Sequence, residues 1–440
     1  MGEKPIKELV RRLKSGIPFN EIKDIRQTVY LADKEDAKDD DIVLFSHEEC
    51  LKDKLKQAKN FRHIERNPTS TMPHVSCQKV GKQVIVVNPP FPPMTEAEID
   101  ASYNLPYTRL PHPKYKGKVI PAFEMIKFSV NIHRGCFGGC AFCTISAHQG
   151  KFIASRSKES ILKEVKAITE MPDFKGYLSD LGGPSANMYR MKGKDERICA
   201  KCKKPSCISP VVCKNLNADH TPLLDIYKAV DRLPGIKKSF IGSGVRYDLL
   251  LHRYADESLN KAAQTYTEEL IARHVSGRLK VAPEHTQDGV LKQMRKPSFS
   301  QFGQFKKIFD KVNRQYGLNQ QLIPYFISSH PGCTEADMAE LAVITKSLHF
   351  QLEQVQDFTP TPMTLATEMY YTGYHPYTLE KVYTARSKEQ KLAQRQFFFW
   401  YKPESRRQIM QVLQKMGRKD LIEKLFGQRG DMNPAPRKRR

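Results

Sequence analysis

Short apolar runs alternate with amphipathic stretches through the middle of the chain. The apolar runs predict strands and lie at 176–181, 238–241, 278–282, 322–328 and 353–358. The amphipathic stretches predict helices and lie at 223–232, 267–274, 300–316 and 335–350. Strands that alternate with helices in this way favour a parallel sheet covered by helices, either barrel-like or doubly wound. We therefore expect an α/β fold whose strand-ending loops meet at one end.

The same patterns predict elements on both sides of this series. A stretch with one apolar face opens the chain and ends near Gly16, a residue that suits a helix C-terminus. Ser157 is placed to cap a helix through Ile168, and Ser387 with Gln390 forms a capping-box pattern. The other predicted elements are helices at 44–66, 387–401 and 404–416, strands at 83–88 and 125–132, and a charged turn at 32–41.

Three thiols follow the apolar run at 125–132 on a glycine-rich segment, NIHRGCFGGCAFCTISA. Cys136, Cys140 and Cys143 form a C-x3-C-x2-C triplet. Glycine lets the backbone wrap around one centre, and thiolates favour zinc or iron–sulfur clusters. Three ligands leave a fourth position free, as at sites that do chemistry. A structural zinc site with a distant fourth ligand is the alternative.

Four more thiols lie in a lysine-rich insertion that lacks hydrophobic periodicity. They form C-x2-C-x4-C-x5-C and are Cys199, Cys202, Cys207 and Cys213. A segment without a core gains order when it binds a metal. Zinc and an auxiliary iron–sulfur cluster both accept four thiolates, so the sequence leaves both open. The remaining cysteines are isolated and are expected to be ordinary thiols: Cys50, Cys77 and Cys333.

The charge balance adds a candidate partner. The 440 residues include 72 Lys and Arg against 48 Asp and Glu, a formal net charge of +24. Such an excess favours a polyanionic partner such as nucleic acid, and a solvated basic face is the alternative. No run approaches the roughly eighteen apolar residues of a membrane span, and no signal-peptide pattern is present. We therefore expect a cytoplasmic protein, where clustered thiols indicate metal or redox chemistry rather than disulfides.

Several segments resemble the YgiQ-type branch of the radical S-adenosylmethionine (SAM) superfamily. Phe142, directly before the last cysteine of the triplet, gives the C-x3-C-x-aromatic-C signature of that superfamily. The other matching segments are PYTRLPHPKY (106–115), SDLGGPSANMY (179–189), SGVRYD (243–248), KVAPEHT (280–286), IPYFISSHPG (323–332) and MYYTG (369–373). The resemblance covers residues 80–426.

The resemblance implies a partial (β/α)6 TIM-like barrel with C-terminal helices. Relatives usually carry a cobalamin-binding-like domain before the barrel, and this chain resembles only the last part of it. The implied division is an N-terminal remnant and linker (1–80), a lead-in segment (81–118), the radical SAM core (119–376) with its cysteine-rich insertion (190–217), a helical segment (377–426) and a disordered basic tail (427–440).

The resemblance also implies roles for individual residues. The cysteine triplet would hold a 4Fe–4S cluster with SAM on its fourth iron, and Phe142 would pack near the adenine. Gly182 and Gly183 match a glycine pair whose exposed backbone edge receives the SAM amino group. The superfamily often has a glutamate after that pair, where this chain has Pro184. Further contacts to the ribose, carboxylate and adenine would come from Ser243, Arg246 and Glu284.

The implied activity is reductive cleavage of SAM to a 5′-deoxyadenosyl radical, which abstracts hydrogen from a substrate that the sequence does not identify. A flavodoxin or ferredoxin is the expected reductant. Two alternatives remain open at this point. One is an RNA-modifying radical enzyme similar to methylthiotransferases, and the other is a non-catalytic, zinc-dependent nucleic-acid-binding protein.

Overall fold

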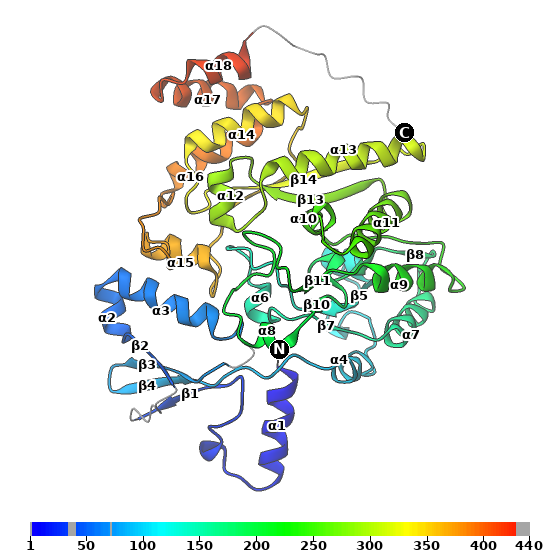
Figure 1. The fold of residues 1–440 in the computed structure, drawn as a ribbon, viewed down its shortest axis with the longest axis vertical. Coiled ribbons are helices and arrows are strands. Elements are labelled where there is room, and N and C mark those ends of the chain that lie inside the picture. The colour runs from blue at the N-terminus through cyan, green and yellow to red at the C-terminus, as the bar shows by residue number, and fades with distance from the viewer. Residues whose placement is uncertain (1, 34–40, 71–72, 428–440) are drawn as a thin grey trace.

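The structure is a computed structural model that describes residues 2–33, 41–70 and 73–427, and its fold is mixed α/β (Figure 1). The predicted basic tail lies outside these residues from 428 onwards, as does most of the predicted charged turn at 32–41. Within the described ranges, no helix is both long enough and apolar enough to cross a membrane.

A four-stranded sheet forms the N-terminal part, and α1 (Glu3–Lys14) projects beyond it (Figure 1). The strand order is β1-β4-β3-β2, with β4 antiparallel to both neighbours and β2 parallel to β3. The bounds are β1 Val29–Ala32, β2 Ile42–Leu44, β3 Ser76–Val80 and β4 Gln83–Val87. The hydrophobic pattern predicts only β4. The outer strands β1 and β2 are short and contain no fully buried residue, so they carry little pattern to detect.

The helix predicted at 44–66 is divided into α2 (His47–Lys52) and α3 (Lys54–Arg66). Asp53 between them has an extended backbone, and its side chain accepts a hydrogen bond from the backbone N–H of Leu55. An aspartate that caps a new helix in this way ends the preceding one. The apolar pattern continues across both helices and therefore conceals the break.

Seven short parallel strands follow and confirm the predicted series. They form three hydrogen-bonded groups: β5 with β9, β8 with β12, and β13-β14-β15. The bounds are β5 Ser129–Asn131, β8 Tyr177–Leu178, β9 Asp180–Gly182, β12 Lys238–Ser239, β13 Arg278–Glu284, β14 Gln321–Ser328 and β15 Gln354–Asp357. The prediction of one strand at 125–132 is too long. Pro121 starts helix α5 (Pro121–Ile126), which occupies the first residues of that run.

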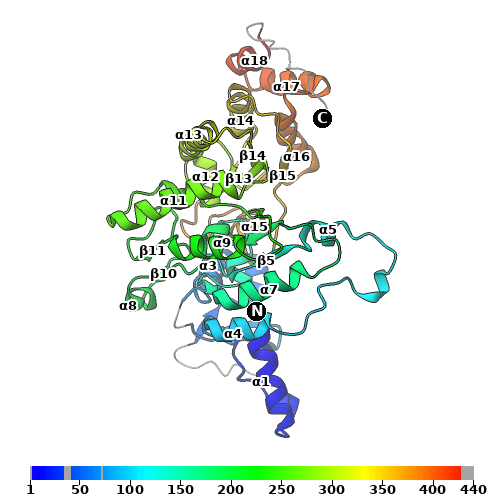
Figure 2. The ribbon, with the colours of Figure 1, turned by 90° about the vertical axis from the view of Figure 1, so that its right-hand side faces the viewer.

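Helices cover these strands and follow one another along one side of the molecule (Figures 1 and 2). Their bounds are α7 Lys158–Thr169, α9 Thr221–Asp231, α11 Glu257–Arg273, α13 Phe299–Gln315 and α14 Glu335–Ser347. Ser157 caps α7 by accepting from the N–H of Ser160, as predicted. Helix α11 begins ten residues before the predicted start at 267, because Asp256 caps it there. A large group of buried apolar side chains lies between these helices and the strands.

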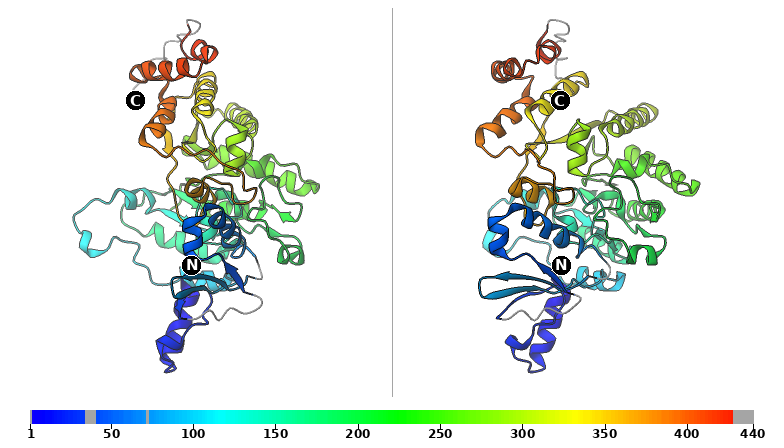
Figure 3. Two further views of the ribbon diagram at one scale, coloured as in Figure 1. Left: turned by 90° about the vertical axis from the view of Figure 1, so that its left-hand side faces the viewer. Right: turned by 60° about the vertical axis from the view of Figure 1, so that its left-hand side comes forward.

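Four C-terminal helices complete the fold, and the last two of them lie at the end of the long axis opposite α1 (Figure 3). They are α15 Leu365–Thr372, α16 Lys388–Arg395, α17 Pro403–Lys415 and α18 Lys419–Phe426. The capping box of Ser387 and Gln390 starts α16 as predicted, but the chain turns into a 3-10 helix after Arg395. Helix α15 packs against α3 and so joins the C-terminal and N-terminal parts. The remaining short elements are α4 Glu96–Tyr103, β6 His133–Arg134, α6 Ile145–His148, β7 Ala154–Ser155, β10 Lys192–Gly193, α8 Glu196–Ala200, β11 Leu216–Asn217, α10 Tyr247–Leu251 and α12 Asp288–Met294.

Candidate functional site

The cysteine loop begins directly after β5 and β6, and its turns require glycine. Gly135 and Gly139 have φ angles of +91° and +60°, in the left-handed region. A Cβ atom on Gly139 would lie 2.8 Å from the carbonyl oxygen of Pro205, and one on Gly135 would overlap the carbonyl of Phe152. Neighbouring backbone therefore encloses the loop on two sides, which fixes the path of the three cysteines.

The three thiols of the loop lie within electrostatic range of one another. The backbone N–H of Gly138 points at Sγ of Cys136 at 3.4 Å. Burial, together with the neighbouring Cys140 and Cys143, raises the pKa of Cys136 to about 12. Burial and Cys140 likewise raise the pKa of Cys143. Binding a metal deprotonates cysteine, so this buried triplet favours the thiolate form only when a cation is present.

A guanidinium lies against the triplet. Nη1 of Arg246 donates to Sγ of Cys140 at 3.5 Å and opposes the rise of the Cys136 pKa. Nε and Nη2 of Arg246 bind the carboxylate of Asp248 at 2.9 and 2.6 Å, and both side chains are buried. Although burial raises the Asp248 pKa, Arg246 outweighs it and lowers that pKa overall. Asp248 therefore fixes the guanidinium beside the thiols, a role that the sequence analysis does not predict.

The glycine pair lies at the end of β9, next to the start of the cysteine loop. Gly182 pairs with Asn131 of β5, and its carbonyl accepts from the N–H of Ile132 at 2.8 Å. A Cβ on Gly183 would lie 2.6 Å from Nδ1 of the buried His133. Gly182 is buried and Gly183 is partly exposed, and the carbonyl of Gly182 is bonded inside the protein. The carbonyl of Gly182 is therefore not free to receive the SAM amino group. The predicted contact of the glycine pair with SAM stays a prediction.

Ser243 is held by a carboxylate that the sequence analysis does not single out. The backbone N–H groups of Gly242 and Ser243 donate to Oδ1 of Asp180 at 2.9 and 3.1 Å, and the Ser243 hydroxyl donates to Oδ2. Burial raises the pKa of Asp180 despite these bonds. A Cβ on Gly182 would overlap the Ser243 hydroxyl. The strand end of β9 and the loop after β12 are thus packed into one polar unit.

Glu284 ends β13 in a strained and buried position. Its φ is +68°, a conformation that residues other than glycine rarely adopt. Oε1 lies 3.7 Å from Nζ of Lys296, whereas Oε2 has no hydrogen-bond partner among the described residues. Burial raises the Glu284 pKa, and this carboxylate adds to the raised pKa of Cys143. A buried carboxylate oxygen without a partner beside the thiols is a candidate ligand-binding atom.

The loops after β13 and β14 bring further polar side chains to Phe142. The ring of Phe142 meets the ring of His330 edge-on, with centroids 5.9 Å apart. Sγ of Cys333 lies 3.5 Å from Nε2 of His285. Burial lowers the pKa of His285 to about 3 and that of His330 to about 4, so both rings are neutral. The prediction of Cys333 as an ordinary thiol did not anticipate this histidine contact, which only the tertiary fold creates.

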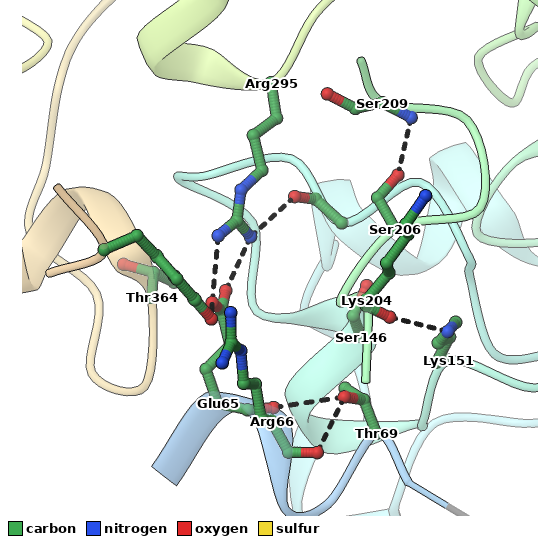
Figure 4. Close-up of polar contacts among 12 residues, drawn as sticks. Glu65, Arg66, Thr69, Ser146, Lys151, Lys204, Ser206, Ser209, Arg295 and Thr364 are labelled. Atoms are coloured by element: carbon green, nitrogen blue, oxygen red, sulfur yellow. Dashed lines mark hydrogen bonds and ion pairs between the residues drawn. The ribbon is translucent and has the colours of Figure 1, made fainter. Parts of the chain in front are cut away.

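Two cavities share Pro205 in their lining, and Figure 4 shows polar contacts among the residues around them, including those of Arg295 with Glu65. A small one, about 40 Å³, is lined by Cys140 and Cys143 together with residues of α3 and the turn before α15. A large one, about 1200 Å³, lies between the cysteine-rich insertion and α12. Arg295 stands between them, because it lines the large cavity, binds Glu65 at 2.6 and 2.9 Å and donates to the carbonyl of Gly139.

The second thiol set lies beside the first. The backbone N–H of Cys207 donates to the carbonyl of Phe137 in the cysteine loop at 3.0 Å. Among the described residues, no group of three or more His, Cys, Asp or Glu side chains is arranged around a single ion position. None of the four cysteines of the insertion forms a disulfide bond: Cys199, Cys202, Cys207 and Cys213.

The class of protein follows from comparison with known families. Residues 1–129 match the family described as Radical SAM N-terminal, and residues 353–429 match a domain of unknown function, DUF3362. Together with the relatives below, the first match places the chain in the radical SAM superfamily.

The chain belongs to the UPF0313 family. It is 68% identical to a UPF0313 protein of Bacteroides thetaiotaomicron over 442 residues, which cover 98% of this chain and 71% of that protein. It is 66% identical to one of Porphyromonas gingivalis (97% and 68% covered) and 44% identical to one of Methanocella arvoryzae (96% and 69% covered). A solved structure of TsrM, a radical SAM methyltransferase from Kitasatospora setae with cobalamin and a [4Fe–4S] cluster bound, matches at a TM-score of 0.36. Its identity is 13%, with 58% of this chain and 42% of that chain covered. A match of that size does not define the fold.

Proposed function

We propose that this chain is a radical SAM enzyme whose cysteine triplet holds a 4Fe–4S cluster with SAM on the fourth iron. The observation that carries the proposal is the glycine-wrapped loop that gathers Cys136, Cys140 and Cys143, with the Arg246 guanidinium beside them. When bound, the cluster and SAM supply one-electron cleavage of the sulfonium, giving a 5′-deoxyadenosyl radical that removes hydrogen from a substrate. A flavodoxin or ferredoxin is the proposed electron donor.

The chain's own residues supply binding, charge and exclusion of water. The three cysteines bind as thiolates, whose negative charge the Arg246 guanidinium partly offsets. Asp248 keeps that guanidinium in place through two charge-assisted hydrogen bonds. Glu284, at the end of β13, offers a carboxylate oxygen without a hydrogen-bond partner among the described residues. Phe142 offers an aromatic ring beside the last cysteine of the triplet. We propose these two residues, with Gly182, Gly183 and Ser243, as the SAM-binding side of the site.

We further propose that the three parallel strand groups are parts of one partial (β/α)6 barrel. In chain order the strands would be β5, β9, β12, β13, β14 and β15. Two backbone bonds between the groups support this order. The N–H of Leu181 donates to the carbonyl of Phe240, and the N–H of Ile241 donates to that of His274. The domain boundaries given above stay predictions.

Product analysis tests the proposed function. The protein is reconstituted anaerobically with iron and sulfide, reduced with dithionite and incubated with SAM. We expect 5′-deoxyadenosine from the wild type and from Cys77→Ala, a variant in the distant N-terminal sheet. Cys136→Ala should give none, because three thiolates are needed to leave the fourth iron as the only open position. Equal product from Cys136→Ala and Cys77→Ala would contradict the proposal, and a protein that holds zinc but no iron even after reconstitution would favour the non-catalytic alternative.

A second candidate function, an RNA-modifying radical enzyme, is favoured by the large cavity. Its lining includes Lys203, Lys204 and Lys292, and none of these three forms an ion pair among the described residues. The segment with Lys203 and Lys204 adjoins the cysteine loop, so an anion bound there would lie close to the thiols. Unpaired cations in a cavity of about 1200 Å³ suit the phosphates of a nucleic acid.

Salt dependence of RNA binding tests this candidate. The probe is a single-stranded RNA oligonucleotide, and binding is measured by fluorescence anisotropy across a range of salt concentrations. Replacing the three cavity lysines by glutamine should lower the slope of log K against log salt by about 2, since each phosphate contact contributes about 0.7. The matched control carries the same change at exposed lysines of α7 and α9, Lys163, Lys166 and Lys228. Equal slopes for the two triple variants would contradict RNA binding in the cavity.

A further inference from the structure

One buried lysine, Lys151, contacts a thiol of the insertion and lies within electrostatic range of two others. Sγ of Cys199 accepts from Nδ2 of Asn215 at 3.3 Å, and Sγ of Cys202 accepts from Nζ of Lys151 at 3.8 Å. The backbone N–H of Cys213 donates to the carbonyl of Cys207 at 2.8 Å, which closes the last part of the motif into a turn. The Cys207 thiol is in electrostatic range of the other three thiols and of the Lys151 ammonium. The tertiary fold therefore brings all four cysteines of the motif within electrostatic range of one another, although they do not yet surround a single ion position.

Lys151 is a buried cation that lacks a carboxylate partner. Its exposed fraction is 3%, and its ammonium also donates to the carbonyl of Lys204 at 2.6 Å. No carboxylate of the described residues forms an ion pair with it. A buried ammonium is costly unless negative charge lies next to it. Thiolates are the groups in place to supply that charge, and a bound metal is what stabilises thiolates at neutral pH.

The insertion rests directly on the cysteine loop of the candidate active site. The N–H of Cys207 donates to the carbonyl of Phe137, and the Ser206 hydroxyl donates to the carbonyl of Gly138 at 2.8 Å. The carbonyl of Pro205 lies so close to Gly139 that any side chain there would collide with it. Phe137 is also buried in an apolar cluster against which Cys207 packs. The path of the cysteine loop therefore depends on where residues 205–207 are held.

We infer that the insertion forms a second metal site of four thiolates, which holds residues 205–207 against the cysteine loop. Its ligands are Cys199, Cys202, Cys207 and Cys213. Four thiolates close a tetrahedral zinc site and equally hold a 4Fe–4S cluster, so the shared chemistry is a tetrathiolate site with no open position. The insertion contributes only Met191, Ile208 and Leu216 as fully buried apolar side chains to a small cluster, and a bound metal would order the lysine-rich turns outside it.

Metal analysis of a variant that lacks the first thiol set tests this inference independently of the proposed function. Cys136, Cys140 and Cys143 are all replaced by alanine, and zinc and iron per chain are measured after purification and again after anaerobic reconstitution. We expect one zinc per chain, or iron with equal sulfide and visible absorption. Either result supports the site and distinguishes the two metals. Neither metal in stoichiometric amount would overturn it.

Removal of one ligand from the second set gives the matched comparison. Adding Cys207→Ser to the triple variant should abolish metal binding, whereas adding Cys50→Ser, at a buried thiol of α2, should leave it unchanged. Equal metal content in these two variants would contradict the ligand assignment. Because Cys207→Ser could unfold the insertion, a chelator is also used to remove the metal from the triple variant without further substitution.

Hydrogen exchange tests the coupling between the insertion and the cysteine loop. On chelation, amides of residues 136–140 and 205–213 should both exchange faster, because the bonds from Cys207 and Ser206 to the loop would be lost. Amides of α9 serve as the internal control, since that helix lies in the separate apolar core. Faster exchange in 205–213 alone would overturn the proposed hold on the cysteine loop.

Discussion

The buried pair of Arg246 and Asp248 provides a quantitative test of the site. Arg246→Met keeps the apolar stem of the side chain and removes its charge. Arg246 and Asp248 are 11% and 7% exposed, so the change leaves a buried carboxylate without its partner. Breaking a buried pair from one side costs about 3–5 kcal/mol. We therefore expect the free energy of unfolding of the metal-free protein to fall by about that amount.

The second consequence of Arg246→Met falls on the thiols. At the observed 3.5 Å and an effective dielectric constant near 20, a guanidinium attracts a thiolate by about 5 kcal/mol. The Asp248 carboxylate, 2.6–2.9 Å from the guanidinium, offsets part of that attraction. Without the cation, the pKa of Cys136 rises further, because Arg246 is a group that lowers it. The variant should therefore retain less iron after reconstitution than the wild type.

The assay is urea unfolding followed by the fluorescence of the single tryptophan, Trp400. The control is Arg278→Met, which breaks an ion pair with Glu353 of the same 2.6 Å length but with both side chains more than half exposed. That change should cost no more than about 1 kcal/mol. The double variant with Asp248→Asn should lose less than the two single variants together, because the residues are coupled. Equal losses for Arg246→Met and Arg278→Met would refute the reasoning.

Two further predictions concern packing and pH. Gly183→Ala places a methyl group against the His133 ring and should cost about 1–3 kcal/mol in urea unfolding, whereas Gly244→Ala, with open space around it, should cost far less. Burial raises the pKa of Glu368 to about 7, so the folded state holds a proton that the unfolded chain releases near pH 4.5. Stability should therefore fall between about pH 4.5 and 7, by up to about 3 kcal/mol, and Glu368→Gln should abolish that fall. A wild-type stability that does not change over this range would contradict the assignment.

The sequence predicts those parts of the fold that follow from local pattern. The strand and helix series from 176 to 358 is confirmed, as are the caps at Ser157 and Ser387, because periodicity and capping chemistry are local properties. The N-terminal sheet is largely missed, since β1 and β2 are short and are specified by pairing with distant strands. The C-terminal helix α18 is missed for a similar reason. It has only eight residues and buries Leu421 and Leu425 against other helices.

The sequence also identifies the cysteines of the site but not the groups that control them. Spacing and glycine content are visible in one segment, so both thiol sets can be found by inspection. Asp180 and Lys151 act on partners that are distant in the sequence, so spacing does not reveal them. Asp248 stands two residues after Arg246 in the segment SGVRYD, but only the fold shows that the pair is buried beside Cys140.

Each thiol set has one buried cation beside it, and only the cation beside the triplet has a carboxylate partner among the described residues. Arg246 beside the triplet is already balanced by Asp248, whereas Lys151 beside the second set has no carboxylate partner among the described residues. Four thiolates on zinc or on a 4Fe–4S core carry more negative charge than three do. The set with the fourth thiolate is therefore the one that retains an unbalanced cation. If both sites bind metal, Lys151→Met should lower the metal content of the second site, whereas Arg246→Met should lower the iron content of the triplet and leave the metal of the second site unchanged.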